Sequence, residues 1–295
     1  MMHLYYLPLE LVARVASELV ELDMGDLVSF ACSSRFCLRA AVAEVHTLIL
    51  RNEHDVYELM TPAAKFLREG VIDCTIEFAD SEWDTGRDSP AVKSLASRLL
   101  PNCKMLQICD LRPWYPEADE EHPKPCFIPG QNTTELTIVT RGAVTSTAPI
   151  MDIFVKANKL PNLTSLCIEH PDGLQAAEID IIASVCPALE RAAIVVDRAD
   201  PFPDPCLPPF PKLVELKLWN ILPFLKEDAF KVLDWASCDA PSLRSISVNR
   251  TNYGPVFDEI LWVLQERLKT IGIELSVFEP DAWFREPSLE PELSG

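Results

Sequence analysis

The first 45 residues carry apolar positions at helical spacing. Five of them, each three or four residues from the next, are Leu7, Leu11, Val15, Leu19 and Leu22. One face of an α-helix has this period, and Pro8 suits the first turn, where a backbone N–H has no helical partner. Residues 23–26 interrupt the pattern, and Asp26 is expected to cap a second helix that carries the helical signal towards Val45. The pattern predicts a helical unit over residues 1–45, whose apolar face must be covered by the rest of the chain or by another protein.

Beyond residue 45 a different pattern recurs: apolar, two residues, apolar, one residue, apolar. Its copies begin at Val45, Val71, Cys103, Thr133, Leu163, Leu189, Leu213, Leu243 and Leu268. The last two apolar positions of a copy are separated by one residue, as on one face of a β-strand. The middle position recurs at 30-residue intervals at Leu106, Leu136 and Leu166. Self-similarity in this range is typical of stacked supersecondary units.

Helical spacing returns between these short strands. The predicted helices cover residues 91–100, 150–160, 174–185, 226–236 and 256–268. A strand followed by a helix at this period predicts an α/β array. The alternative is an ordinary α/β domain in which the spacing is coincidental.

Proline-rich stretches interrupt and end the array. Residues 113–130 combine several prolines with a cluster of acids, and residues 200–211 are richer still in proline. Both are expected to be stiff, extended surface loops. Residues 279–295 form an acidic, proline-containing tail, in which Trp283 and Phe284 are candidates for docking back as a cap.

The order of residues in the N-terminal unit resembles the F-box. The matching stretches are Leu7-Pro8-x-Glu10-Leu11, then Val15 and Leu19, then Asp26-Leu27-Val28, and finally Ser34-Arg35-Phe36. The strand–helix units beyond it resemble degenerate leucine-rich repeats. The resemblance implies an α/β fold in which a helical F-box (1–45) precedes a leucine-rich-repeat-like solenoid (46–278). In that family the solenoid is a horseshoe with a parallel sheet on its inner face.

The same resemblance implies protein binding and a role in ubiquitination. The F-box would bind the adaptor subunit of an SCF-type cullin–RING ubiquitin ligase, and the repeats would bind a protein substrate. The implied adaptor-binding residues are Leu7, Pro8, Leu11, Val15, Leu19, Leu27 and Phe36. Catalysis would come from the proximity that the assembly supplies. The chain is therefore expected to be a substrate-recognition subunit of the ligase and not itself an enzyme.

The strand pattern also indicates a substrate-binding position. Residues beside the last two apolar positions of a copy point away from the core, and in a horseshoe they line the inner face. Trp219 is a large aromatic at such a position, with Val195 and Asn249 on the neighbouring strands and Lys217 two residues earlier. An aromatic beside a charge and an amide is typical of binding hot spots. The alternative is that Trp219 packs beneath residues 200–211.

Charge and composition narrow the partners. The formal net charge is −19, and no basic stripe is present, so a nucleic-acid partner is not expected. The sequence has neither a signal-peptide pattern nor an apolar run long enough to span a membrane, which predicts a cytoplasmic or nuclear protein. The ten cysteines lack CxxC or zinc-ligand spacing and are expected to be reduced, mostly buried residues.

The sequence contains no P-loop, GxGxxG, GxSxG or HExxH motif. His122 and Cys126 are near one another, but a nucleophile pair needs a rigid orienting shell that a proline-rich stretch does not provide. No cofactor or metal is expected. The first alternative function is a repeat scaffold for protein–protein interaction with no ubiquitin-ligase role, its N-terminal helices serving as a cap. A more distant one is a hydrolase or transferase with its site in the proline-rich stretches.

Overall fold

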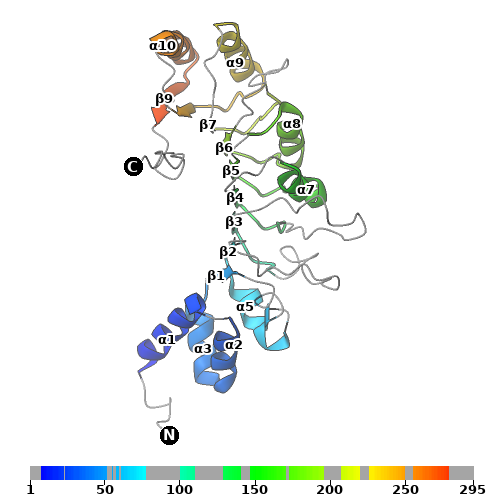
Figure 1. Cartoon of the computed structure of the whole chain (residues 1–295), viewed down its shortest axis with the longest axis vertical. Helices are drawn as coiled ribbons and strands as arrows, with labels where there is room; N and C mark the ends of the chain where they lie inside the picture. Colours follow the sequence, from blue (N-terminus) through cyan, green and yellow to red (C-terminus); the bar gives the residue numbers. More distant parts are fainter. Residues whose placement is uncertain are drawn as a thin grey trace, which may run out of the picture.

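The structure is a computed structural model of the whole chain, and its described part leaves several stretches out. The described residues are 8–22, 24–51, 55, 58–59, 61–77, 100–109, 129–140, 147–170, 173–195, 207–219, 226–249 and 255–278. The molecule is elongated: its strands follow one another along the long axis, with three helices at the N-terminal end and the last helix at the other (Figure 1).

The N-terminal unit consists of three helices, α1 (Leu9–Leu22), α2 (Met24–Ser33) and α3 (Arg35–Glu44). Asp26 does not cap α2 as predicted, because the helix already begins at Met24 and Asp26 lies in its first turn. The sequence pattern did not predict the break between α2 and α3. Ser34 makes it: its hydroxyl accepts the N–H of Cys37 at 3.1 Å, which caps the first turn of α3.

The body of the chain is one parallel sheet whose nine described strands follow the order of the chain. The strands are β1 (Thr47–Leu50), β2 (Asp73–Glu77), β3 (Met105–Cys109), β4 (Glu135–Val139), β5 (Ser165–Glu169), β6 (Arg191–Val195), β7 (Glu215–Trp219), β8 (Ser245–Asn249) and β9 (Glu274–Phe278). The α/β class and the strand of each sequence copy but the last are confirmed. The arrangement is compatible with a solenoid-like α/β fold.

The register of the sheet aligns the repeated apolar positions. Leu136 of β4 pairs with Leu166 of β5, and Ile138 pairs with Ile168. All four side chains are buried. Equivalent positions of successive copies therefore stack in one continuous core, as the period predicted.

The last copy was assigned wrongly. The predicted anchors Ile271 and Ile273 precede β9, and it is Leu275 that pairs with Ile246 of β8. The helix before β9 continues through Thr270, so Ile271 lies in the connecting turn and is exposed. The correction moves the middle anchor by four residues and places it 29 residues after Ile246, in line with the 30-residue intervals earlier in the chain.

Helices cover one face of the sheet. They are η2 (Pro62–Ala64), α5 (Lys65–Gly70), α7 (Ala148–Ala157), α8 (Ala176–Val185), α9 (Lys226–Cys238) and α10 (Pro255–Thr270). Four of the predicted helices are confirmed as α7 to α10, whereas residues 91–99 of the fifth lie outside the described part. Figure 1 shows α7, α8 and α9 along the same side of the strands. Buried residues of these helices, such as Phe154 and Ile182, join the strand anchors in one apolar cluster.

A ladder of side-chain hydrogen bonds links the turns that precede the strands. The amide groups of Asn102, Asn132 and Asn162 each donate to a backbone carbonyl one unit earlier, at 2.7, 2.7 and 2.8 Å. Ser242 makes the equivalent bond to the carbonyl of Pro211 at 2.8 Å. Each of these residues directly precedes the first apolar position of a copy. The bonds satisfy carbonyls that neither helix nor strand pairing reaches.

The end of the second proline-rich stretch, residues 207–211, contributes to the core. The prediction that the whole of residues 200–211 is a surface loop is therefore wrong for this part. Leu207 and Phe210 are buried, and the indole N–H of buried Trp235 donates to the carbonyl of Pro208 at 2.9 Å. A buried indole needs such a partner, and this carbonyl supplies it. Residues 200–206 lie outside the described part, as do residues 113–128 of the first stretch and the tail.

Candidate protein-interaction surfaces

Helix α1 leaves an apolar strip on the surface. Val12 and Ala16 face the protein and are fully buried, whereas Leu11 is 49 % exposed and Val15 is 42 % exposed. A hollow of about 440 Å³ lies over this strip, bounded by Leu11, Arg14, Val15, Glu18 and Leu19. We call these five residues the α1 surface. Two adjacent exposed apolar side chains on a helix, with charges at their edge, form the kind of surface that a partner protein covers.

The predicted adaptor-binding residues differ in how exposed they are in the structure. Pro8 is exposed, Leu19 and Phe36 are half-buried, and Leu7 lies outside the described residues. Leu27 is fully buried against the chain's own core, which corrects its assignment to the adaptor-binding set. Its position in α2 turns it towards the rest of the protein, where it supports the helical unit.

The second surface is the sheet face opposite the helices, which we call the open sheet face. Because side chains alternate along a strand, the residues beside the buried anchors form rows across it. Paired neighbours in its middle row are Thr75, Gln107, Thr137, Cys167, Ala193, Lys217, Ser247 and Ser276. Each of these residues is either half-buried or exposed.

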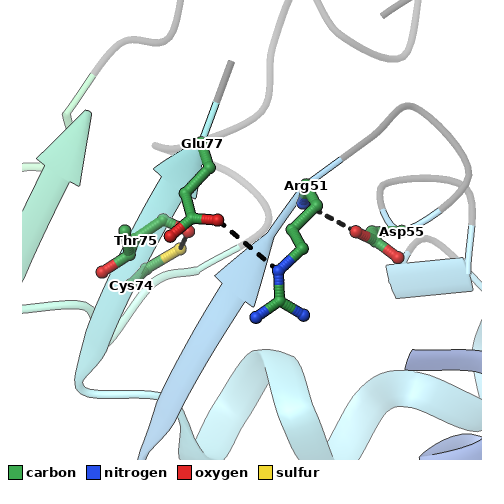
Figure 2. A network of polar contacts seen from close by, with 5 residues as sticks. All are labelled: Arg51, Asp55, Cys74, Thr75 and Glu77. Atoms are coloured by element: carbon green, nitrogen blue, oxygen red, sulfur yellow. Dashed lines mark hydrogen bonds and ion pairs between the residues drawn. The ribbon is translucent and has the colours of Figure 1, made fainter. Parts of the chain in front are cut away.

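Two ion pairs link strands across this face. Arg51, just after β1, reaches Glu77 at the end of β2, with Nε and Oε2 separated by 3.5 Å (Figure 2). The backbone N–H of Arg51 also donates to Asp55 at 2.7 Å, which holds the chain where it leaves β1. Arg191 of β6 lies 3.6 Å from Glu135 of β4, across the intervening strand. Both arginines are largely exposed, so these pairs contribute little to stability.

The predicted substrate-binding residues do not form one exposed group. Val195 is 1 % exposed, and its carbonyl accepts the N–H of Leu174 at 2.7 Å, so its assignment to an open surface is wrong. Lys217 is half-buried, with its ammonium 4.2 Å from the centre of the Phe278 ring, in a cation–π contact. The backbone at Trp219 and Asn249 belongs to β7 and β8, and their side chains lie outside the described part.

Burial and like charge shift the pKa of two groups on the open sheet face. Desolvation, followed by the neighbouring charge of Glu135, raises the pKa of Asp73 above its usual value. Burial, followed by the charge of Glu169, raises the pKa of the Cys167 thiol to about 12. Cys167 is therefore a neutral thiol at physiological pH and a poor nucleophile.

A second hollow lies at the edge of the sheet where the strands begin. It measures about 750 Å³ and is lined by residues of the turn ladder, among them Asn102, Asn132 and Asn162. Each of these amides already donates to a carbonyl of the preceding unit. This hollow is a consequence of the stacked turns, and its lining residues have a structural role.

Within the described ranges, no three or more His, Cys, Asp or Glu side chains are grouped so that they could hold a metal ion. The helices of that same part of the chain include none that is long and apolar enough to cross a membrane. A comparison of the sequence with known protein families and with curated proteins finds no match.

Proposed function

We propose that this chain is the substrate-recognition subunit of an SCF-type cullin–RING ubiquitin ligase. The α1 surface binds the adaptor subunit of the ligase, and the array of strands and helices holds the substrate. The single observation that carries the proposal is the exposure of Leu11 and Val15 on the helix that begins the F-box-like sequence. Two apolar side chains in this position are unfavourable in water and become favourable when a partner covers them.

The position of α1 in the molecule supports this assignment. The helical unit lies at one end of the elongated fold, and most of the strands extend away from it (Figure 1). One end of the chain then attaches to the ligase while the other part presents the substrate. This arrangement fits a subunit that acts through proximity and performs no chemistry itself.

The experiment is co-purification of the chain with the adaptor subunit after co-expression. The variant Leu11→Ala with Val15→Ala should weaken capture by about 2 kcal/mol, or about thirtyfold, because five carbon atoms of buried contact are lost. Its melting temperature should stay close to that of the native chain, since both side chains are exposed. The control is Val155→Ala on α7, an apolar residue that is 59 % exposed and far from α1, and this variant should capture the adaptor normally. Equal capture by the double variant and the native chain would contradict the proposal.

One observation favours the scaffold alternative. Leu27, Val28 and Ala31 of α2 belong to the same apolar cluster as Leu48 and Leu50 of β1. The helical unit thus also covers the first strand of the sheet, as a terminal cap does. If capping is its only role, the native chain captures no adaptor at all, whereas the ligase proposal requires capture that depends on α1.

A further inference from the structure

Apart from Lys217, the middle row of the open sheet face is uncharged, whereas the two rows beside it carry several charged residues. Most middle-row residues are small or uncharged, and the shortest of them include Thr75, Thr137, Ala193 and Ser247. On each strand the residues two positions earlier and two positions later point to the same side of the sheet. Those two outer rows carry most of the charge, and the middle row between them consists mostly of short side chains.

Carboxylates outnumber cations among the described side chains of this face. The acids are Asp73, Glu77, Glu135, Glu169, Glu215 and Glu274, and the bases are Arg51, Arg191 and Lys217. The three bases are already engaged with Glu77, Glu135 and the ring of Phe278. Glu215 and Glu274, on β7 and β9, are both exposed. The described part of this face therefore carries more negative than positive charge.

We propose that the open sheet face binds an extended, lysine- or arginine-rich segment of the substrate, which crosses the strands along the middle row. The inference rests on the proposed function, because it specifies the class of substrate that the array would hold. The backbone of the segment lies over the short side chains, and its cationic side chains reach the carboxylates of the outer rows.

The dimensions of the face set the length of such a segment. The nine strands are about 4.8 Å apart, so the sheet spans about 38 Å from β1 to β9. An extended chain advances about 3.3 Å per residue, so about 12 residues cover that span. The short side chains of the middle row leave room for a backbone, whereas bulky residues would not.

The state of Asp73 is consistent with this electrostatic arrangement. Burial and, after it, the nearby negative charge of Glu135 raise the pKa of this carboxyl, as expected where carboxylates lie close together. A cation bound between them removes their repulsion. Lys217 is a charged member of the middle row, and its ammonium lies 4.2 Å from the centre of the Phe278 ring, so it is directed towards the outer row at the end of β9.

The test uses the full chain and a fluorescent peptide of about 12 residues in which lysine and serine alternate, the length that the sheet spans. Binding is followed by fluorescence anisotropy at about 0.05 M and about 0.3 M salt, since screening weakens exposed ion pairs. We expect binding at low salt that falls at high salt. The same peptide with glutamate in place of lysine should not bind.

Two matched double variants locate the binding site. Glu215→Gln with Glu274→Gln should weaken the lysine peptide about fivefold, a modest change because each exposed ion pair contributes little. Asp180→Asn with Glu266→Gln removes the same charge from α8 and α10, on the helical side, and should change affinity by less than about twofold. Thermal unfolding of each variant verifies that the fold is retained.

Equal weakening by both double variants, or no binding to the native chain, would overturn the inference. The failure of the proposed function is recognised separately, because adaptor capture depends on Leu11 and Val15 and not on Glu215 or Glu274. A chain that captures the adaptor but not the peptide keeps the function and loses the inference. A chain that binds the peptide through these two glutamates but does not capture the adaptor keeps the basic-segment site and loses the ligase function.

Discussion

The α1 surface and the open sheet face are both accessible, yet they differ in chemistry. On α1 the exposed residues at the centre of the surface are Leu11 and Val15, with charges only at the edge. On the sheet the centre is occupied mostly by short or neutral side chains, with Lys217 as a charged exception, and the edges carry carboxylates. The first surface is small and apolar, and the second is long and acidic.

This difference indicates two kinds of binding. Affinity at an apolar surface comes from removing carbon atoms from water, which depends little on salt. Affinity at an acidic face comes from exposed charges, which salt screens. A single chain with both surfaces can hold one partner steadily and exchange another, which suits a subunit that bridges a permanent assembly and a transient substrate.

The largest expected effect separates the surface leucine of α1 from the core leucine of α2. Leu27→Ala should lower the free energy of unfolding by about 2–5 kcal/mol, because it leaves a cavity in a fully buried site. Leu11→Ala should change it by less than about 0.5 kcal/mol, since the side chain is half exposed. Urea denaturation of the two variants measures both values. Comparable losses would mean that Leu11 belongs to the core and that the α1 surface is not a free surface.

The next largest expected change in stability compares a buried threonine beside the sheet with a threonine on its open face. Thr133 is buried just before β4, and its hydroxyl has no hydrogen-bond partner among the described atoms. Thr133→Val should stabilise the fold by about 1 kcal/mol, because the desolvated hydroxyl is replaced by a methyl group of similar size.

Thr137→Val provides the control for that experiment. Thr137 lies on the open face of β4 and is only half-buried, so this substitution should leave stability nearly unchanged. Denaturation midpoints measured under identical conditions give the comparison. Stabilisation by Thr137→Val alone would show that the two faces are assigned the wrong way round.

The smallest expected effect concerns the charge of the open sheet face. Because the pKa of Asp73 is raised in the folded protein, its ionised form is disfavoured there relative to the unfolded chain. Ionisation therefore costs stability above the folded pKa, and this cost disappears as pH falls below the unfolded value. Asp73→Asn should raise the melting temperature at pH 7 by less than about 2 °C.

The pH dependence of that difference is the measurement. The gain of Asp73→Asn over the native chain should shrink as pH is lowered through the folded pKa, and it should vanish near pH 3. A gain that grows towards acid pH would mean that Asp73 is stabilised by cations instead, and the acidic character of the face would be weaker than proposed.

Local pattern was sufficient to predict most of the described strands and four of the described helices, but not α5, the break between α2 and α3, or the position of β9. Apolar residues one position apart at Leu136 and Ile138 determined a strand with one buried face, and helical spacing determined α7 to α10. These predictions follow from the period of a β-strand and the period of an α-helix, and each period depends only on residues that are close together in the sequence. The copy at the end of the chain was misplaced because Leu268, Ile271 and Ile273 match both periods. Only the continuation of α10 through Leu268 decided between them.

The surfaces were decided by tertiary packing. Leu11 and Leu27 both fit the apolar positions of the helical unit, and the sequence does not distinguish them. Packing buries Leu27 against the core and leaves Leu11 in water. Val195 and Lys217 likewise occupy the same face of neighbouring strands by alternation, yet Val195 is buried and Lys217 remains accessible. The reason is physical: the period of an element determines which residues share a side, but the neighbours that cover that side come from distant parts of the chain.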